Sequence, residues 1–224
     1  MLELLSVDTI AFTIVGYPMS YLELVGTVLY LASVWLITRK NMLTWPVGIV
    51  SVLLYMALFY QIRLYSDALE QVYYLGASLY GWWYWRRADP AVAADNAPDF
   101  RYSRPQSLGL VAAGTLLGSL LVGALMGRVH LLLPAIFPEA ASFPYLDALT
   151  TIMSFTAMGL MAQKRIESWI YWIIVDAVGI WLYFVKDVRF ISLLYVVLLF
   201  MAFNGLLSWT KVLKESGRAA YSQP

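Results

Sequence analysis

Residues 20–38 read SYLELVGTVLYLASVWLIT, an apolar stretch in which Glu23 is the one charged residue. An α-helix needs about 20 residues to cross the roughly 30 Å hydrocarbon layer of a bilayer, so this stretch predicts a transmembrane helix. Similar stretches lie at residues 44–62, 66–85, 107–127, 144–162, 167–185 and 190–210. The sequence therefore predicts an all-α integral membrane protein with seven transmembrane helices.

The composition agrees with a chain surrounded by lipid. Hydrophobic residues make up 61% of the 224 residues and charged residues 13%, with a mean hydropathy of +0.70. A soluble domain is about one quarter charged, and this chain has too few polar residues to cover a water-facing surface. The net charge of +1 gives no field that would recruit nucleic acid, so the lipid bilayer is the expected partner.

The sequence offers no chemistry for an enzyme or for a resident cofactor. There is no cysteine, and His130 is the only histidine, so we expect no metal site. The motifs of nucleotide-binding loops, serine hydrolases and zinc proteases are also missing. We therefore expect no catalytic residues and no cofactor.

An internal repeat organises the chain. At an offset of 124 residues, and without a gap, the following residues coincide: Tyr21 with Tyr145, Glu23 with Asp147, Lys40 with Lys164, Trp45 with Trp169, Ile49 with Ile173, Gly81 with Gly205, and Trp85 with Trp209. Residues 19–86 and 143–210 would then be two three-helix repeats, joined by a linker transmembrane helix at 106–128. Such a 3+1+3 order makes the repeats parallel, and transporters with repeats place the substrate site at the repeat interface.

The remaining segments flank these repeats. Residues 1–18 are shorter than a span and contain Glu3 and Asp8, which favours a retained interfacial helix over a signal peptide. Residues 87–105 are predicted to be a polar cytoplasmic linker, and residues 211–224 a cytoplasmic tail.

The distribution of basic residues predicts the orientation. Eleven of the 15 Lys and Arg residues fall on one side of seven spans: Arg39, Lys40, Arg86, Arg87, Arg101, Arg104, Lys164, Arg165, Lys211, Lys214 and Arg218. The other side has Arg63, Arg128, Lys186 and Arg189. By the positive-inside rule the first side, which includes the C-terminus, is cytoplasmic.

Polar residues within the predicted spans suggest a binding site. Trp169, Trp172 and Asp176 share one face of a helix with Gly179 and Tyr183. Two indoles and a carboxylate suit a flat, cationic aromatic ligand, because rings attract a cation and the carboxylate offsets its charge. The alternative is structural: Trp169 would be an interfacial anchor and Asp176 a hydrogen-bond partner between helices.

Further candidates lie in the third and seventh spans. Gln71 and Tyr74 would bind hydroxyl groups or, alternatively, link two helices, and Asn204 offers both a donor and an acceptor. Glu23 and Asp147 occupy equivalent places early in the two repeats, which favours symmetric structural roles. We expect Gly81 and Gly205 to permit close helix contacts.

The residues also resemble a known family. The stretch from Trp45-Pro46-Val47-Gly48 through Gln71 to Tyr80-Gly81-Trp82, with Glu167-Ser168-Trp169-Ile170-Tyr171-Trp172 and Asn204-Gly205, is similar to the PnuC vitamin transporters. The resemblance implies two three-helix repeats joined by one helix, as in SWEET sugar carriers. It implies ligand contacts at Gln71, Trp169, Trp172 and Asn204. It also implies facilitated diffusion of nicotinamide riboside, followed by trapping through cytoplasmic phosphorylation by a vitamin kinase.

Asp176 departs from that resemblance, which implies Asn there in nicotinamide riboside carriers. A carboxylate suits either cation, nicotinamide riboside or thiamine, whereas riboflavin is neutral and larger. The leading hypothesis is a uniporter for nicotinamide riboside in the bacterial inner membrane, with a thiamine transporter as the alternative and riboflavin third. A non-transporting membrane subunit and an intramembrane enzyme rank below these, and a homo-oligomer is compatible with the sequence.

Overall fold

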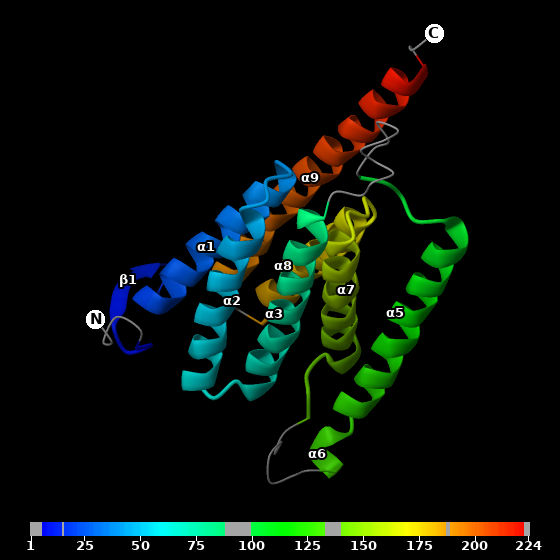
Figure 1. Ribbon diagram of the computed structural model, residues 1–224. Helices are drawn as coiled ribbons and strands as arrows, with labels where there is room; N and C mark the ends of the chain where they lie inside the picture. Colours follow the sequence, from blue (N-terminus) through cyan, green and yellow to red (C-terminus); the bar gives the residue numbers. More distant parts are fainter. Residues whose placement is uncertain (1–5, 15, 88–99, 133–139, 187–188, 222–224) are drawn as a thin grey trace.

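The computed structural model describes residues 6–14, 16–87, 100–132, 140–186 and 189–221. These residues form a bundle of helices preceded by a β-hairpin (Figure 1). The strands are β1 (Ile10–Ile14) and β2 (Tyr17–Ser20). The helices are α1 (Tyr21–Thr38), α2 (Thr44–Gln61), α3 (Tyr65–Arg86), α5 (Pro105–Met126), α6 (Val129–Leu132), α7 (Pro144–Ala162), α8 (Ser168–Val185) and α9 (Arg189–Tyr221).

Six of the described helices are long and apolar enough to cross a membrane: α1, α2, α5, α7, α8 and the Arg189–Glu215 part of α9. They agree with six of the spans expected from the sequence. The expected span 66–85 is also helical, as α3, but α3 is not among the six. Its early turns contain Asp67, Glu70 and Gln71, which lower its hydropathy.

The expected interfacial helix at residues 1–18 is wrong for its described part, because residues 10–20 form an antiparallel hairpin. Ile10 and Ile14 are β-branched and favour a strand. Gly16 has a φ of 81°, a left-handed conformation that suits glycine in the tight connection between the strands. Residues 1–5 lie outside the described part of the chain.

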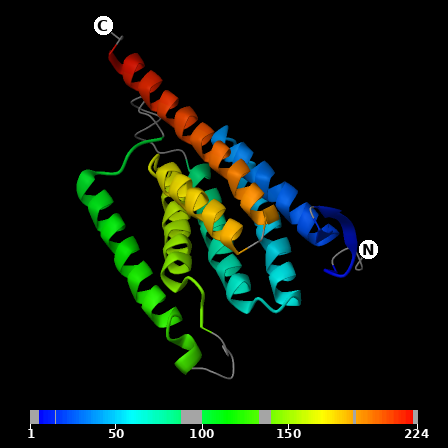
Figure 2. The same cartoon turned by 180° about the vertical axis from the view of Figure 1, so that it is seen from behind.

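The helices form one continuous bundle, with α5 at its edge. Within residues 21–86, called the first half, α2 packs against α1 and α3; within residues 144–221, called the second half, α8 packs against α7 and α9. The halves meet where α3 contacts α7 and where α1 contacts α9. Both views show α5 beside α7 and away from the hairpin (Figures 1 and 2).

Two turns that lie 124 residues apart have the same backbone geometry. Lys40 follows α1 and Lys164 follows α7, and each has a φ of 58°. The Lys40 N–H donates to the Ile37 carbonyl across 2.9 Å, and the Lys164 N–H to the Met161 carbonyl across 3.0 Å. Each turn therefore ends its helix with a left-handed residue, a common way to satisfy the last carbonyls.

The buried core gathers at the end of the bundle where these two turns lie. The indole of Trp45 covers Gly81, and that of Trp169 covers Gly205, so closely that a side chain at either glycine would overlap the ring. The next layer repeats the pattern: the Trp45 and Trp85 rings meet edge to face at 5.4 Å, and those of Trp169 and Trp209 at 5.3 Å. Glycine at both contacts thus lets the helices approach closely, as expected.

A short segment at residues 100–103 closes this end. Phe100 is buried, with its ring 5.7 Å from that of Trp85 and 4.3 Å from that of Trp209. The Arg101 N–H donates to the Lys164 carbonyl, and the Arg101 carbonyl accepts from the Ile166 N–H. The end of the predicted linker 87–105 is therefore packed against both halves, while residues 88–99 lie outside the described residues.

Candidate binding cavity

A cavity of about 330 Å³ lies between the two halves. Residues of α1, α2 and α3 line it from the first half, and residues of α7, α8 and α9 from the second. Small-molecule sites usually measure about 300–1,000 Å³, so this cavity is large enough for a nucleoside-sized ligand.

Five of the six expected site residues line this cavity: Gln71, Tyr74, Trp169, Trp172 and Asp176. Asn204 does not; it is exposed on α9. On that helix Leu198 and Ala202 face the cavity, and Asn204 lies two residues further on, about 200° around the helix axis. The position of Asn204 within the predicted span 190–210 therefore did not reveal which way its side chain points.

Among the described residues, the charged groups that line the cavity are all acidic: Asp67, Glu70 and Asp176. Asp176 is 3% exposed, and no described residue gives its carboxylate a hydrogen bond or an ion pair. A buried carboxylate without a partner is unfavourable in an apolar environment. A cationic ligand in the cavity would supply the missing partner.

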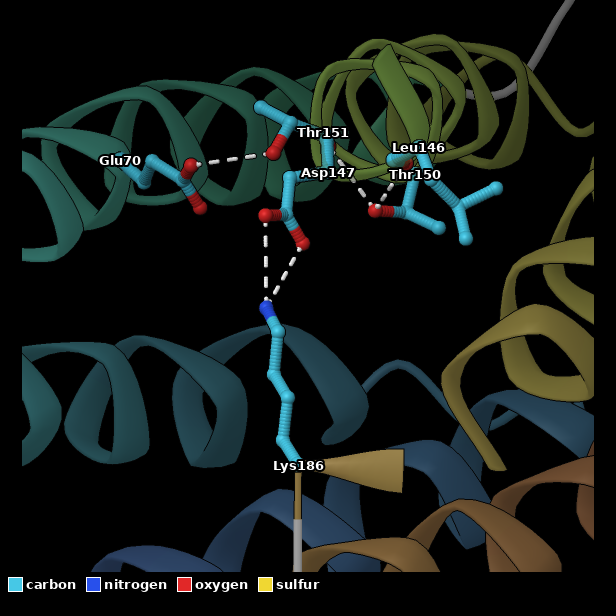
Figure 3. Close-up of polar contacts among 6 residues, drawn as sticks. All are labelled: Glu70, Leu146, Asp147, Thr150, Thr151 and Lys186. Atoms are coloured by element: carbon cyan, nitrogen blue, oxygen red, sulfur yellow. Dashed lines mark hydrogen bonds and ion pairs between the residues drawn. The ribbon is translucent and has the colours of Figure 1, made fainter. Parts of the chain in front are cut away.

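The polar residues of α3 form a stripe toward the cavity, consisting of Asp67, Glu70, Gln71, Tyr74 and Ser78. Their spacing places them on one helical face. Glu70 accepts a hydrogen bond from the Thr151 hydroxyl on α7 across 3.3 Å (Figure 3). The stripe explains why α3 is less apolar than its neighbours: this face meets a cavity rather than lipid.

An ion pair lies beside the stripe, near the end of the bundle opposite the aromatic core. Lys186, which follows α8, donates to the two carboxylate oxygens of Asp147 across 3.1 and 3.3 Å (Figure 3). Both side chains are partly exposed, at 32% and 43%. Asp147 does not line the cavity. Its contact with Lys186 instead joins α7 to the end of α8.

Glu23, the counterpart of Asp147, also makes a local contact. Its carboxylate accepts a hydrogen bond from the Tyr17 hydroxyl across 2.9 Å, and the Tyr17 ring stacks on that of Phe190 at 5.6 Å. Burial, followed by the hydrogen bond to Glu23, raises the pKa of Tyr17 to about 12. These contacts hold the hairpin against α1 and α9.

The aromatic lining includes a residue that the sequence interpretation omitted, Trp45. It lines the cavity together with Trp169 and Trp172, and its match to Trp169 at the 124-residue offset was the signal that could have found it. The indole nitrogens of all three tryptophans are buried, with no acceptor among the described residues. Donors of this kind suit a ligand that carries oxygen atoms. Among the described residues no three His, Cys, Asp or Glu side chains form a group that could hold a metal ion.

This fold defines a class: a multi-pass helical membrane protein with a ligand-sized cavity between two halves. The sequence model of the family described as nicotinamide mononucleotide transporter matches residues 20–211. Because the match covers most of the sequence, the chain belongs to this family. It is therefore a membrane transporter.

Curated relatives bear two kinds of name. The nicotinamide riboside transporter PnuC of Escherichia coli (strain K12) is 29% identical over 226 residues, 92% of each chain. The riboflavin/roseoflavin transporter RibM of Streptomyces davaonensis is 28% identical over 199 residues, 89% of each chain. The nicotinamide riboside transporter PnuC of Neisseria mucosa is 25% identical over 227 residues, 96% of this chain and 81% of that one.

A solved structure shares the fold. The crystal structure of the vitamin B3 transporter PnuC superposes with a TM-score of 0.65 at 21% sequence identity, covering 88% of this chain and 83% of the other. The described helices thus adopt the arrangement of that transporter.

Proposed function

We propose that this chain carries nicotinamide riboside across the membrane by facilitated diffusion. One observation supports this most strongly: the cavity between the halves has three carboxylates and no basic residue among its described lining. Nicotinamide riboside is a pyridinium cation with a ribose, so it complements an acidic cavity that also contains aromatic rings and hydrogen-bonding side chains. Two of the relatives bear the name of this vitamin.

Each part of the vitamin has a matching side chain. Trp169 and Trp172 would stack on or beside the pyridinium ring, because aromatic faces attract cations. Asp176 would offset the positive charge. Gln71 and Tyr74 would bind the ribose hydroxyls, since an amide and a phenol both donate and accept hydrogen bonds.

The charge of the cavity also favours the riboside over the mononucleotide that the family description names. A phosphate monoester carries about −1.5 to −2 charges at pH 7. In this cavity it would face Asp67, Glu70 and Asp176 without a Lys, Arg or His among the described lining residues. The unphosphorylated vitamin avoids this repulsion.

Thiamine and riboflavin are the competing substrates. Thiamine is also an aromatic cation, and it satisfies the same charge argument. Riboflavin is supported by the name of one relative, but it is neutral and would leave Asp176 unpaired. We therefore place nicotinamide riboside first, thiamine second and riboflavin third.

We further propose that α3 crosses the membrane together with the six apolar helices, giving seven spans in a 3+1+3 order with α5 as the linker. The matching turns at Lys40 and Lys164, and the matching contacts of Trp45 with Gly81 and Trp169 with Gly205, support two parallel repeats. The excess of basic residues on one side of the spans supports a cytoplasmic C-terminus in the inner membrane of a bacterial cell. A cytoplasmic kinase would then trap the vitamin by phosphorylation.

Uptake into liposomes that contain only this protein tests the proposal. Labelled nicotinamide riboside should equilibrate across the membrane without ATP or an ion gradient, and unlabelled thiamine should compete better than riboflavin or nicotinamide mononucleotide. Protein-free liposomes are the control. Equal uptake with and without the protein would refute transport, and stronger competition by the mononucleotide would refute the charge argument.

A further inference from the structure

The cavity lies where the two halves face each other, and its lining comes in matched positions. Residues separated by 124 positions line it from both sides, including Trp45 and Trp169, Gly48 and Trp172, Val52 and Asp176, and Gln71 and Tyr195. The first three pairs lie on α2 and α8, which are the second helices of the two halves. The two halves therefore line the cavity with equivalent backbone positions, but the side chains at several of these positions differ.

The asymmetry is greatest at two of these pairs. On α8 an indole and a carboxylate, Trp172 and Asp176, lie one helical turn apart, whereas α2 has Gly48 and Val52 at the equivalent places. At these two places α8 therefore supplies an aromatic ring and a charge. At the equivalent places α2 supplies only the apolar Val52, and no side chain at the position that matches Trp172.

We propose that Gly48 is a specificity-determining residue: the missing side chain at this position leaves the volume that the ligand occupies beside Trp172. A large side chain there would reduce a cavity of about 330 Å³ from the side of the first half. The space left at Gly48 would let the cationic ring lie against Trp172 and Asp176 of the second half. The proposal depends on the proposed function only in its choice of ligand.

The surroundings of Gly48 leave room for a first side-chain carbon, on the side where Ser33 of α1 also lines the cavity. A Cβ atom at Gly48 would lie 3.6 Å from the Ser33 Cβ and 3.7 Å from its Oγ, which are ordinary van der Waals distances. Alanine also favours helix more than glycine does. Gly76 on α3 offers a matched control, because it is a helical glycine outside the cavity lining and has open space around it.

The experiment is a binding titration of purified full-length protein with nicotinamide riboside and with 1-methylnicotinamide, a smaller pyridinium cation that has the same ring. The variants are Gly48→Ala, Gly48→Val, Gly48→Leu and the control Gly76→Leu, each checked for its thermal transition. We expect affinity for the riboside to fall stepwise with side-chain size, by at least about tenfold for leucine, or about 1.4 kcal/mol. The smaller cation should lose less, and Gly76→Leu should bind both ligands like the wild type.

Two results separate this inference from the proposed function. Unchanged riboside affinity in the largest Gly48 variant that keeps the wild-type thermal transition would overturn the role of Gly48, while the transporter proposal would stand. Absence of riboside binding to the wild-type protein would overturn the proposed substrate. The same variants, titrated with thiamine, would then decide whether Gly48 limits the size of that ligand instead.

Discussion

The indole nitrogen of Trp85, near the end of α3, donates a hydrogen bond to the carbonyl oxygen of Ala162, the last residue of α7, across 3.1 Å. The counterpart of Trp85, Trp209 on α9, donates in the same way to the carbonyl of Ile37 in the last turn of α1, also across 3.1 Å. Each half thus uses a buried tryptophan to satisfy a carbonyl at a helix end of the other half. This exchange joins the halves at one end of the cavity.

Replacing Trp85 with phenylalanine should lower the stability of the folded protein by about 1–2 kcal/mol. The ring contacts are largely kept, but the buried Ala162 carbonyl loses its donor, and an unsatisfied polar group is costly. The midpoint of thermal unfolding in detergent measures the effect. Trp83→Phe is the control, because Trp83 is exposed and has no indole hydrogen bond among the described contacts; equal destabilisation by both changes would contradict the role of the bond.

Asp176→Asn should weaken binding of nicotinamide riboside by roughly tenfold, or about 1.4 kcal/mol. The loss should be smaller for the reduced riboside, which is neutral and nearly the same size, because only the charged form gains from a carboxylate. Paired binding titrations with the two ligands measure the difference. Asp147→Asn, outside the cavity, is the control. Equal losses for the charged and neutral ligands would show that Asp176 has a structural role.

Trp172→Ala should lower affinity for nicotinamide riboside by roughly 1–3 kcal/mol, the range measured when an aromatic side chain that stacks on a base is removed. Trp181→Ala on the same helix should leave the affinity unchanged, because Trp181 is exposed and does not line the cavity. Titration by intrinsic fluorescence or calorimetry distinguishes the two variants. If Trp172→Ala bound like the wild type, Trp172 would not belong to the site.

Asn204→Ala should change affinity by no more than about twofold, since substitutions at exposed positions usually change free energies by less than about 0.5 kcal/mol. The side chain points away from the cavity on α9. The same titration measures it, with Gln71→Ala as the comparison that should lose affinity. A loss at Asn204 as large as that at Gln71 would restore Asn204 to the list of ligand contacts.

The ion pair of Asp147 and Lys186 should contribute little to stability, about 0.2–1 kcal/mol, because both groups are partly exposed and water screens them. A double-mutant cycle with Asp147→Asn and Lys186→Met measures the coupling energy between them. High salt should reduce this energy further. A coupling energy well above 1 kcal/mol that salt leaves unchanged would mean that the pair is shielded from water.

Much of the fold could be predicted from the sequence because it depends on local properties. Hydropathy over about 20 residues located α1, α2, α5, α7, α8 and the apolar part of α9, and a constant offset of 124 residues matched the turns at Lys40 and Lys164. The face shared by Trp169, Trp172 and Asp176 followed from helical spacing, which does not depend on neighbouring helices. Membership of a membrane transporter family is confirmed by the match over residues 20–211.

Packing decided the rest. Helical spacing does not say which face of α9 turns inward, so Asn204 was assigned to the site although it is exposed on the opposite side of the helix. The strands β1 and β2 form by pairing with each other, which local hydropathy does not predict. Phe100 is buried between Trp85 and Trp209, and these three residues are distant in the chain. The sequence alone determined which segments prefer lipid and that the chain contains two similar halves. Only the tertiary structure decided which side chains meet between those halves, because that depends on the rotation of each helix against its neighbours.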